Sequence, residues 1–420
     1  MQTGRARQPD PIAWCTAIAL AFLVIAIHRL GLPSKLYFDE IHYVPAARKL
    51  LAGIAANREH PAFAKQVLAA SIRVLGDGPL AWRLPALLFG TFGLFAFGRL
   101  LWQASASRFA TLAGMALLAT NFSWFIQSRI AMLDIVAASL AIGALWQFAT
   151  ALDKARPRAR LHLGLCGVLI GLALGSKWSV APVALAMGVA WLFLRRRRRG
   201  AGRPAIALGE AACWLGLLPL LVYWATFAPE LFLANGSFPA SPSGFIDRHR
   251  EMIALLDSTI KPHPYRSAWY EWVINWRPVW YLYEPVDGAQ RGIVQLGNPF
   301  TMLAGLPALA WCLWTGVARG RRDALAFALL WCACLALWPL SGKPVQFYYH
   351  YLLSGAWLMA CLAIALADMV RSDGKWRGAA LVTLPLALAM FVHFYPIISA
   401  AELHEGRSAF REWMWLDSWR

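Results

Sequence analysis

Long apolar runs separated by short polar stretches dominate the chain. A helix needs about 20 apolar residues to cross the hydrocarbon of a bilayer. Runs near that length cover residues 11–30, 79–102, 109–126, 131–150, 161–175, 178–194, 204–228, 299–317, 324–340, 351–367 and 378–396. The runs at 161–175 and 178–194 are the shortest. This pattern predicts an all-α polytopic membrane protein with about eleven transmembrane helices.

Two segments between the runs are too long to be turns. Residues 31–78 and 229–298 are rich in aromatic and charged side chains, which favour the membrane–water interface. We therefore expect two long external loops with helices lying along the membrane surface. The predicted organisation is an N-terminal transmembrane module at 1–228 that includes loop 31–78 and the candidate catalytic residues, an external loop at 229–298 with interfacial helices, C-terminal transmembrane helices at 299–396, and an external tail at 397–420.

Composition and charge agree with a membrane protein and exclude other classes. The chain is 59% hydrophobic and 15% charged, whereas soluble domains are about 45–50% apolar and about 25% charged. The net charge of +18 comes from short basic clusters between the runs, at Arg5 and Arg7, Lys154 to Arg160, Arg195 to Arg199 with Arg203, Arg319 to Arg322, and Arg371 to Arg377. All of them fall on one side if the N-terminus is cytoplasmic and the spans alternate, as cytoplasmic loops require. This distribution argues against nucleic-acid binding and places the C-terminus outside.

Cysteine and glycine positions point to packing. All seven cysteines lie in apolar runs, without the spacing of a zinc site or a disulfide framework. The run at 161–175 carries Gly164, Gly167, Gly171 and Gly175, and small residues at this spacing let helices approach closely in lipid.

The first long loop holds the first candidates for chemistry. Asp39 and Glu40 are adjacent carboxylates just beyond the first run, and a solvated helix start is the alternative interpretation. Downstream, His60 precedes Pro61, which suits the first turn of a helix. Lys65 follows at the membrane surface, where snorkelling is the structural alternative.

Further ionisable residues lie at external junctions between runs. Arg129 and Asp134 lie at the external junction of the third and fourth runs, where charges are costly and often functional, although a mutual ion pair would also lock this turn. Lys177 lies between the fifth and sixth runs, and the phosphate of a lipid carrier would suit it. All these sites map to the external side, which predicts a surface site with carboxylates for base chemistry and cations for phosphate.

The same residues resemble the motifs of protein O-mannosyltransferases. The stretches concerned run from Asp39 to Tyr43, His60 to Lys65, Ser128 to Asp134 and Gly175 to Trp178, then from Ser267 to Trp269, Trp276 to Tyr281, Gly297 to Pro299 and Gln346 to Tyr351. They occur in order between about residues 36 and 366. The resemblance implies a GT-C type glycosyltransferase fold, a polyprenyl-phosphate-mannose donor and a Ser or Thr hydroxyl acceptor in protein.

The chain departs from the eukaryotic members of that family. Residues 229–298 are too few to hold a MIR-type β-trefoil beside helices, which points to a bacterial type and leaves acceptor selection unexplained. Ala62 stands where the family commonly has a second proline. A bacterial inner membrane is the expected location, and the acceptor is expected to emerge from the secretion machinery.

The expected mechanism is inverting. The resemblance implies that Asp39 accepts the hydroxyl proton, and Arg129 and Lys177, with Lys65, are expected to stabilise the leaving phosphate. Glu40 would orient the sugar, the acceptor or Arg129. His60, Asp134 and His350 complete the candidate donor site, although His350 is equally interpreted as a packed histidine.

The sequence also leaves a metal site and three alternative functions possible. A lipid phosphate leaves without a metal, yet Asp39 and Glu40 could hold Mg²⁺ or Mn²⁺. A transfer to lipid A or surface polysaccharide keeps the chemistry and changes the acceptor. A transporter would show internal repeats and midplane charges, neither of which is visible. A catalytically silent subunit is the remaining alternative.

Overall fold

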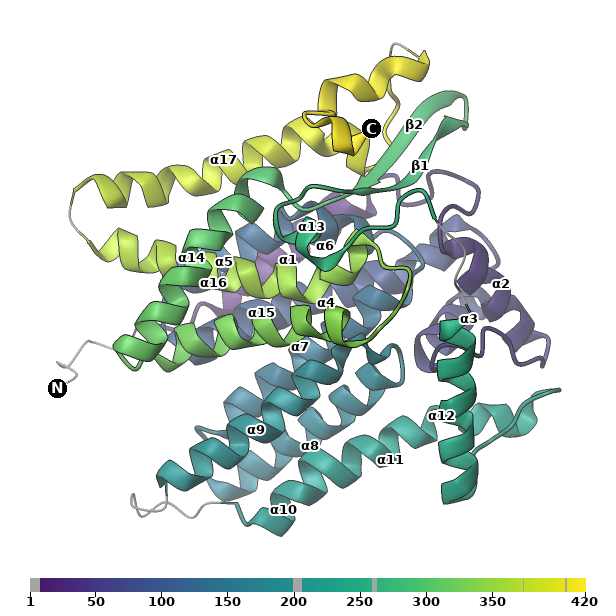
Figure 1. Ribbon diagram of the computed structural model, residues 1–420, viewed down its shortest axis with the longest axis horizontal. Coiled ribbons are helices and arrows are strands. Elements are labelled where there is room, and N and C mark those ends of the chain that lie inside the picture. Colours follow the sequence, from purple (N-terminus) through teal and green to yellow (C-terminus); the bar gives the residue numbers. More distant parts are fainter. Residues whose placement is uncertain (1–7, 199–205, 259–262, 373, 405) are drawn as a thin grey trace.

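The protein is a bundle of long helices with its longer loops gathered at one end (Figure 1). The computed structural model describes residues 8–198, 206–258, 263–372, 374–404 and 406–420. The basic residues Arg5, Arg7, Arg199 and Arg203 lie outside the described residues. The helices are α1 Ile12–Ile27, α2 Glu40–Leu51, α3 Phe63–Leu75, α4 Pro79–Ser105, α5 Arg108–Ala119, α6 Phe122–Gln127, α7 Leu133–Ala151, α8 Arg156–Leu174, α9 Ala181–Arg198, α10 Leu208–Ala212, α11 Leu218–Ala225, α12 Pro242–Asp257, α13 Trp269–Val273, α14 Pro299–Ala318, α15 Arg322–Leu340, α16 Leu352–Arg371 and α17 Lys375–Ile398. The 3₁₀ turns are η1 Trp178–Val180, η3 Ala228–Phe232, η4 Tyr348–Tyr351, η5 Gly406–Trp413 and η6 Asp417–Trp419, and η2 Cys213–Leu217 is π-helical.

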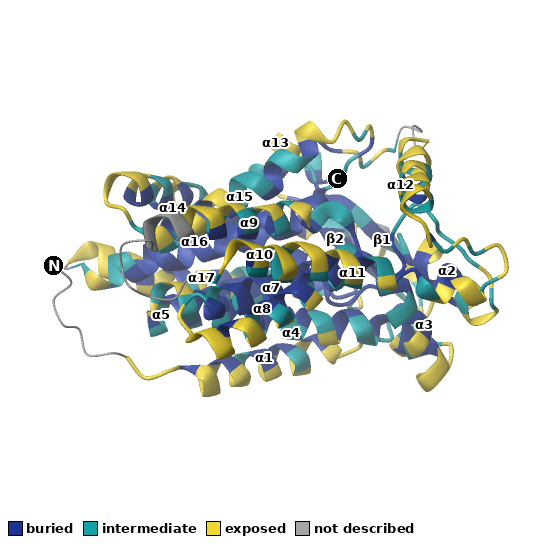
Figure 2. Cartoon of the chain, turned by 90° about the horizontal axis from the view of Figure 1, so that it is seen from below, coloured by how far each residue is buried: buried dark blue, intermediate teal, exposed yellow. Residues whose placement is uncertain are grey.

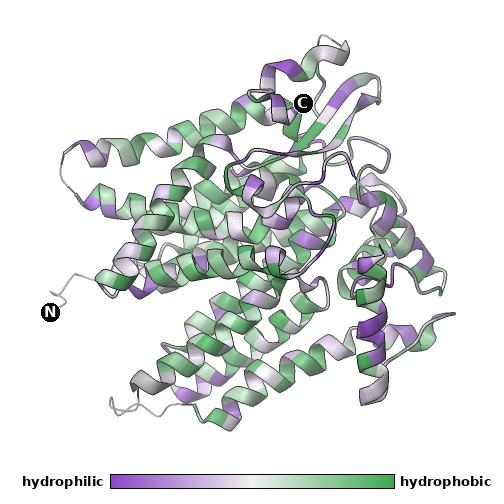
Figure 3. Ribbon diagram, in the orientation of Figure 1, coloured by the Kyte–Doolittle hydropathy of each residue, from purple (hydrophilic) through white to green (hydrophobic). Residues whose placement is uncertain are grey.

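Every predicted apolar run corresponds to a helical segment. Within the described residues, eight helices are long and apolar enough to cross a membrane, and three shorter apolar helices cover Ile12–Ile27, Arg108–Ala119 and Trp178–Leu194. Hydrophobic residues predominate along these helices (Figure 3), as a bilayer requires. The chain is therefore a multi-pass membrane protein, while the number of eleven crossings stays a prediction.

The run predicted at 109–126 is broken into two helices. Helix α5 ends at Ala119 and α6 begins after Asn121, whose side chain accepts a hydrogen bond from the Trp124 amide at 3.3 Å. An asparagine in an apolar run is a strong N-cap signal. Hydropathy alone does not reveal this break, because the residues on both sides of it are equally apolar.

The second long loop was expected to contain helices only, but it also contains two strands. Strands β1 Val279–Val286 and β2 Ala289–Gln295 form an antiparallel hairpin. Its turn residues Asp287 and Gly288 have φ angles of 51° and 75°. Asp-Gly between two strands is the sequence signal for such a turn, so the all-α prediction was wrong in this segment.

The glycines of α8 provide a close contact with α11, as predicted. A Cβ atom on Gly171 would lie 2.7 Å from the Pro219 carbonyl oxygen, and one on Gly167 would lie 2.5 Å from that of Trp214. Both distances are shorter than a carbon–oxygen contact allows. Gly171 therefore faces the backbone of α11 and Gly167 that of η2, and neither position can carry a side chain unless the facing backbone shifts.

The loop elements and the tail lie toward one end of the bundle. Helices α2, α3 and α12 lie together at that end in both views (Figures 1 and 2). Trp419 joins the tail to the second loop, since its indole donates to the Asn275 carbonyl at 2.9 Å and its carbonyl accepts from Trp280 at 3.0 Å. Helices α7 and α16 form the buried centre of the bundle (Figure 2).

Candidate active site

Asp39 lies at the N-cap of α2, recessed but reachable from outside. Within the described part of the chain, no group donates a hydrogen bond to its carboxylate. Burial raises the Asp39 pKa to about 6, with Lys177 opposing the shift and Asp134 adding to it. A carboxylate that is poorly solvated, unpartnered and titrates near neutral pH has the properties of a general base.

Glu40, in contrast, is fully buried and committed to Arg83. The guanidinium donates from Nε to Oε1 at 2.8 Å and from Nη2 to Oε2 at 2.9 Å. Oε1 also accepts from the Ala131 amide at 3.0 Å. Glu40 therefore ties the start of α2 to α4 and to the turn before α7, and its partner is Arg83 in place of the expected Arg129. The sequence analysis missed Arg83, although an arginine inside an apolar run is a signal of function or pairing.

Arg129 is occupied by backbone carbonyls at the end of α1. Nη1 donates to Ala26 and, at 2.8 Å, to His28, and Nη2 reaches the carbonyls of Arg29 and Ser399 at 3.3 Å each. Cations at a helix C-terminus are favourable because the last carbonyls lack partners. Contact of Arg129 with a donor phosphate stays a prediction, and it would require some of these bonds to open.

Lys177 and Asp134 form a buried ion pair. The ammonium lies 2.8 Å from Oδ1 and 2.7 Å from Oδ2 of Asp134, and 5.1 Å from the ring centre of Tyr349. This pair joins the turn before α9 to the first turn of α7, so the alternative Arg129–Asp134 pair does not form. Asp134 holds the lysine beside Asp39, where its charge lowers the Asp39 pKa.

Lys65 of α3 is joined to His60 in the loop before that helix. The Lys65 ammonium donates to the carbonyls of Asn57 and, at 2.8 Å, of His60, which closes the loop before α3. Burial lowers the Lys65 pKa to about 7. His60 stands 6.1 Å from Tyr43 between ring centres, and burial with the nearby charges of Lys177, Lys65 and Lys343 lowers its pKa.

His350 is packed, yet one ring nitrogen has no partner. Nδ1 accepts from the Phe347 amide at 3.0 Å, so Nε2 carries the proton. The ring stacks on Trp338 at 3.9 Å between centres. Nε2 is buried without a hydrogen bond among the described residues and borders a cavity of about 10 Å³ shared with Asp134. That is the volume one water needs.

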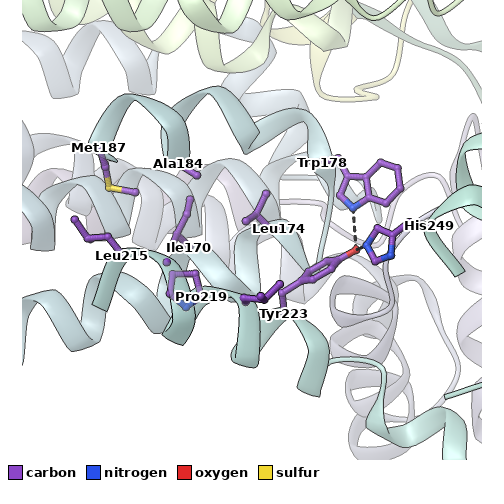
Figure 4. A pocket seen from close by; sticks show the side chains of 11 residues that line it. Ile170, Leu174, Trp178, Ala184, Met187, Leu215, Pro219, Tyr223 and His249 are labelled. Carbon is purple, nitrogen blue, oxygen red and sulfur yellow. Dashed lines mark hydrogen bonds between the residues drawn. The ribbon is translucent and has the colours of Figure 1, made fainter. Parts of the chain in front are cut away.

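An apolar groove of about 280 Å³ begins at Trp178, the residue after Lys177 in the chain, and runs between α8, α9 and α11 (Figure 4). Its outer end is polar: Trp178 donates from Nε1 to the Tyr223 hydroxyl at 3.0 Å, and this hydroxyl donates to His249 Nε2 at 2.7 Å. His249 Nδ1 in turn donates to the Phe245 carbonyl at 2.6 Å. The remainder is lined by Ile170, Leu174, Ala184, Met187, Leu215, Gly216, Pro219 and Leu220.

The two adjacent carboxylates do not fit a shared divalent cation. Both Glu40 oxygens already accept from the Arg83 guanidinium, whose positive charge would repel a metal ion at that position. Among the described residues, no group of three His, Cys, Asp or Glu side chains is arranged to hold a metal. Glu40 is therefore unavailable as a metal ligand in this arrangement.

Two family models match the chain in succession. Residues 59–224 match the dolichyl-phosphate-mannose-protein mannosyltransferase model, and residues 242–419 match the C-terminal four-transmembrane region of protein O-mannosyltransferase. The polyprenol-phosphate-mannose–protein mannosyltransferase of Corynebacterium glutamicum is 27% identical over 98% of this chain and 95% of its own length. That of Mycolicibacterium smegmatis is 26% identical over 96% and 92%.

Solved structures with the same fold support this relation. The S. cerevisiae protein O-mannosyltransferase complex, bound to its sugar donor, aligns with a TM-score of 0.83 at 14% identity over 99% of this chain and 93% of that one. ArnT from Cupriavidus metallidurans, bound to undecaprenyl phosphate, aligns at 0.58 and 15% identity over 93% and 76%. The GT-C type fold is confirmed, and the chain belongs to the protein O-mannosyltransferase family.

Proposed function

We propose that this protein transfers mannose from a polyprenyl-phosphate-mannose donor to Ser or Thr hydroxyls of proteins, with Asp39 as the base. The observation that carries the proposal is the Asp39 carboxylate, unpartnered and with its pKa raised to about 6 beside the Lys177–Asp134 pair. The relatives over nearly the full chain are named for this reaction. The chemistry and the fold thus support the same activity.

The proposed step is a single displacement. The acceptor oxygen attacks C1 of the sugar from the face opposite the phosphate, and its proton moves to a carboxylate oxygen of Asp39. The C1–oxygen bond to phosphate breaks, and its electron pair stays on the lipid phosphate. Attack from the opposite face inverts the anomeric centre. Glu40 holds the start of α2, and therefore Asp39, through Arg83, while Lys177 adds positive charge where the phosphate leaves.

The apolar groove that begins at Trp178 is the place we propose for the polyprenyl tail. The groove lies between the apolar helices α8, α9 and α11, and Trp178 at its polar end directly follows Lys177, the cation proposed for the phosphate. Gly216 lines the groove, and a Cβ there would meet open space. Gly216→Phe is expected to raise KM for the lipid donor. Gly188→Phe, also in open space but outside the groove, is the matched control and is expected to leave KM unchanged.

The central experiment uses membranes containing the protein, labelled lipid donor and a Ser/Thr peptide. Asp39→Asn is expected to abolish transfer, since an amide cannot accept the proton. Asp247→Asn removes an exposed carboxylate of α12 and is expected to retain activity. Near-normal transfer by Asp39→Asn would disprove the role of this residue. If the label is transferred to lipid A or polysaccharide and not to the peptide, the alternative acceptors are favoured.

We further propose a bacterial inner-membrane location, with Asp39 and the tail outside and the N-terminus inside. Helix α2, which begins directly after Asp39, lies at one end of the bundle with the tail (Figure 1), and Glu40 pairs with Arg83 near the start of α4. Asp10, which precedes α1, pairs with Arg99 near the opposite end of α4. Arg321 and Arg371, from two of the basic clusters, both pair with Asp368 away from the Asp39 end. An external site would let the enzyme act on chains emerging from the secretion machinery. Cysteines placed at Asp247 and Arg319 should react with a membrane-impermeant thiol reagent from opposite sides.

A further inference from the structure

Four cations of the candidate site are already held by protein groups. Arg83 is bound to Glu40, Lys177 to Asp134, and Arg129 and Lys65 to backbone carbonyls. A sugar phosphodiester carries about one negative charge, and the lipid phosphate that leaves carries more, so the charge to be stabilised grows during the reaction. An additional cation that is not bound to a protein carboxylate would serve this purpose.

Lys343 lies in a braced turn between α15 and η4. The turn needs Gly342, whose φ is +64°. The Gln346 side chain donates to the carbonyls of Trp338 at 2.9 Å and of Lys343 at 3.2 Å. The Gln346 carbonyl accepts from the Ser267 amide at 2.9 Å, which ties the turn to the second loop. The backbone of Lys343 is therefore fixed, whereas its ammonium forms no ion pair or hydrogen bond with the described residues.

The same turn packs directly on the site. The Phe347 ring lies 6.3 Å from that of Phe38, the residue before Asp39, and 5.6 Å from that of Tyr349, which also lies under the Lys177 ammonium. Lys343 is half-buried there. Its charge acts on Asp39 and lowers the pKa of that carboxyl, while burial and Lys177 lower the Lys343 pKa to about 8. The geometry of this turn, which packs on the residue before Asp39, therefore places the half-buried Lys343 on the same side of the molecule as the base.

We propose that Lys343 is a catalytic residue that contacts the donor phosphate and stabilises the charge that develops on it as the sugar leaves. This role rests on the proposed function. The C1–oxygen bond breaks, the electron pair moves to the phosphate oxygen, and Lys343 keeps its proton and attracts that oxygen electrostatically. Asp39 takes the acceptor proton, so the two residues act on opposite faces of the sugar. Lys177 stays bound to Asp134 and supplies a fixed background charge.

The test compares Lys343→Met, Lys343→Arg and Lys49→Met in the full-length protein. Lys49 is an exposed lysine of α2 on the same end of the molecule and serves as the matched control. We expect Lys343→Met to lower kcat by about 100-fold and to weaken binding of short-chain polyprenyl phosphate, the product, by about 10-fold or more. Lys343→Arg should recover most of both quantities, because it keeps the charge, and Lys49→Met should resemble the wild type.

The outcomes separate this proposal from the proposed function. If the wild type transfers mannose and Lys343→Met has the same kcat and the same affinity for polyprenyl phosphate, the role of Lys343 is overturned and the proposed function is not. Failure of the wild type to mannosylate a peptide would disprove the function, while polyprenyl phosphate binding would still test Lys343. If Lys343→Met lowers Tm, Lys343→Gln replaces it. Equal losses in Lys343→Arg and Lys343→Gln would show that charge is not what this position supplies, and would also overturn the proposal.

Discussion

Removing the Glu40 carboxylate tests whether this residue positions Asp39 or acts on the substrate. Both side chains of the Glu40–Arg83 pair are 0% exposed. In Glu40→Ala, the buried guanidinium would keep the carbonyls of Leu30, Pro33 and Lys35 but lose its only carboxylate among the described residues. Breaking one partner of a buried pair costs about 3–5 kcal/mol. We therefore expect a clear fall in Tm and in the free energy of unfolding in detergent.

Activity should fall for the same geometric reason. Without the pair, the start of α2 is no longer held to α4, and a displacement of the base by about 1 Å is enough to lower kcat about 100-fold. Arg83→Met should produce a similar loss, although Arg83 faces Glu40 and not the site. The double variant Glu40→Leu with Arg83→Met should lose less stability than the sum of the single losses, with a coupling energy of about 2 kcal/mol.

The assay combines unfolding in detergent with peptide mannosylation kinetics on each variant. Asp247→Ala breaks an exposed pair with Arg250 and should change stability by less than about 1 kcal/mol. The positioning role would be refuted if Arg83→Met kept wild-type kcat while Glu40→Gln lost it at unchanged Tm. That pattern would mean that the Glu40 carboxylate acts on the substrate itself.

Three further results are expected. Since the pKa of Asp39 is raised to about 6, its basic form is lost as pH falls through 6, so kcat/KM should decline below that pH, and a decline only near pH 4 would contradict the burial argument. Lys177→Met leaves Asp134 buried without its cation and should destabilise the protein by about 3–5 kcal/mol, while adding Asp134→Asn should restore Tm but not activity. Gly171→Leu should cost about 1–3 kcal/mol of stability because its side chain meets α11, whereas Gly188→Leu, in open space, should show unchanged unfolding.

The membrane architecture follows from the sequence because it depends on local composition. A run of apolar residues near the length of a bilayer forms a helix wherever it occurs, since every backbone group must be paired within the segment. The glycine spacing of the run at 161–175 likewise foretold the close approach of α8 and α11. The ordered family motifs added the fold and pointed to Asp39, whose role is still a prediction.

The partners of each charged side chain were decided only by the tertiary structure. Arg129 and Lys177 look equivalent in sequence, as single cations at external turns. The fold turns the first toward the end of α1 and the second toward Asp134. Glu40 pairs with Arg83, 43 residues away in the chain, and the charge of Lys343, in the turn between α15 and η4, lowers the pKa of Asp39. The strength of an ion pair depends on the distance between the two charges and on their burial. The sequence contains neither quantity for residues that are far apart in the chain and are brought together by helix packing.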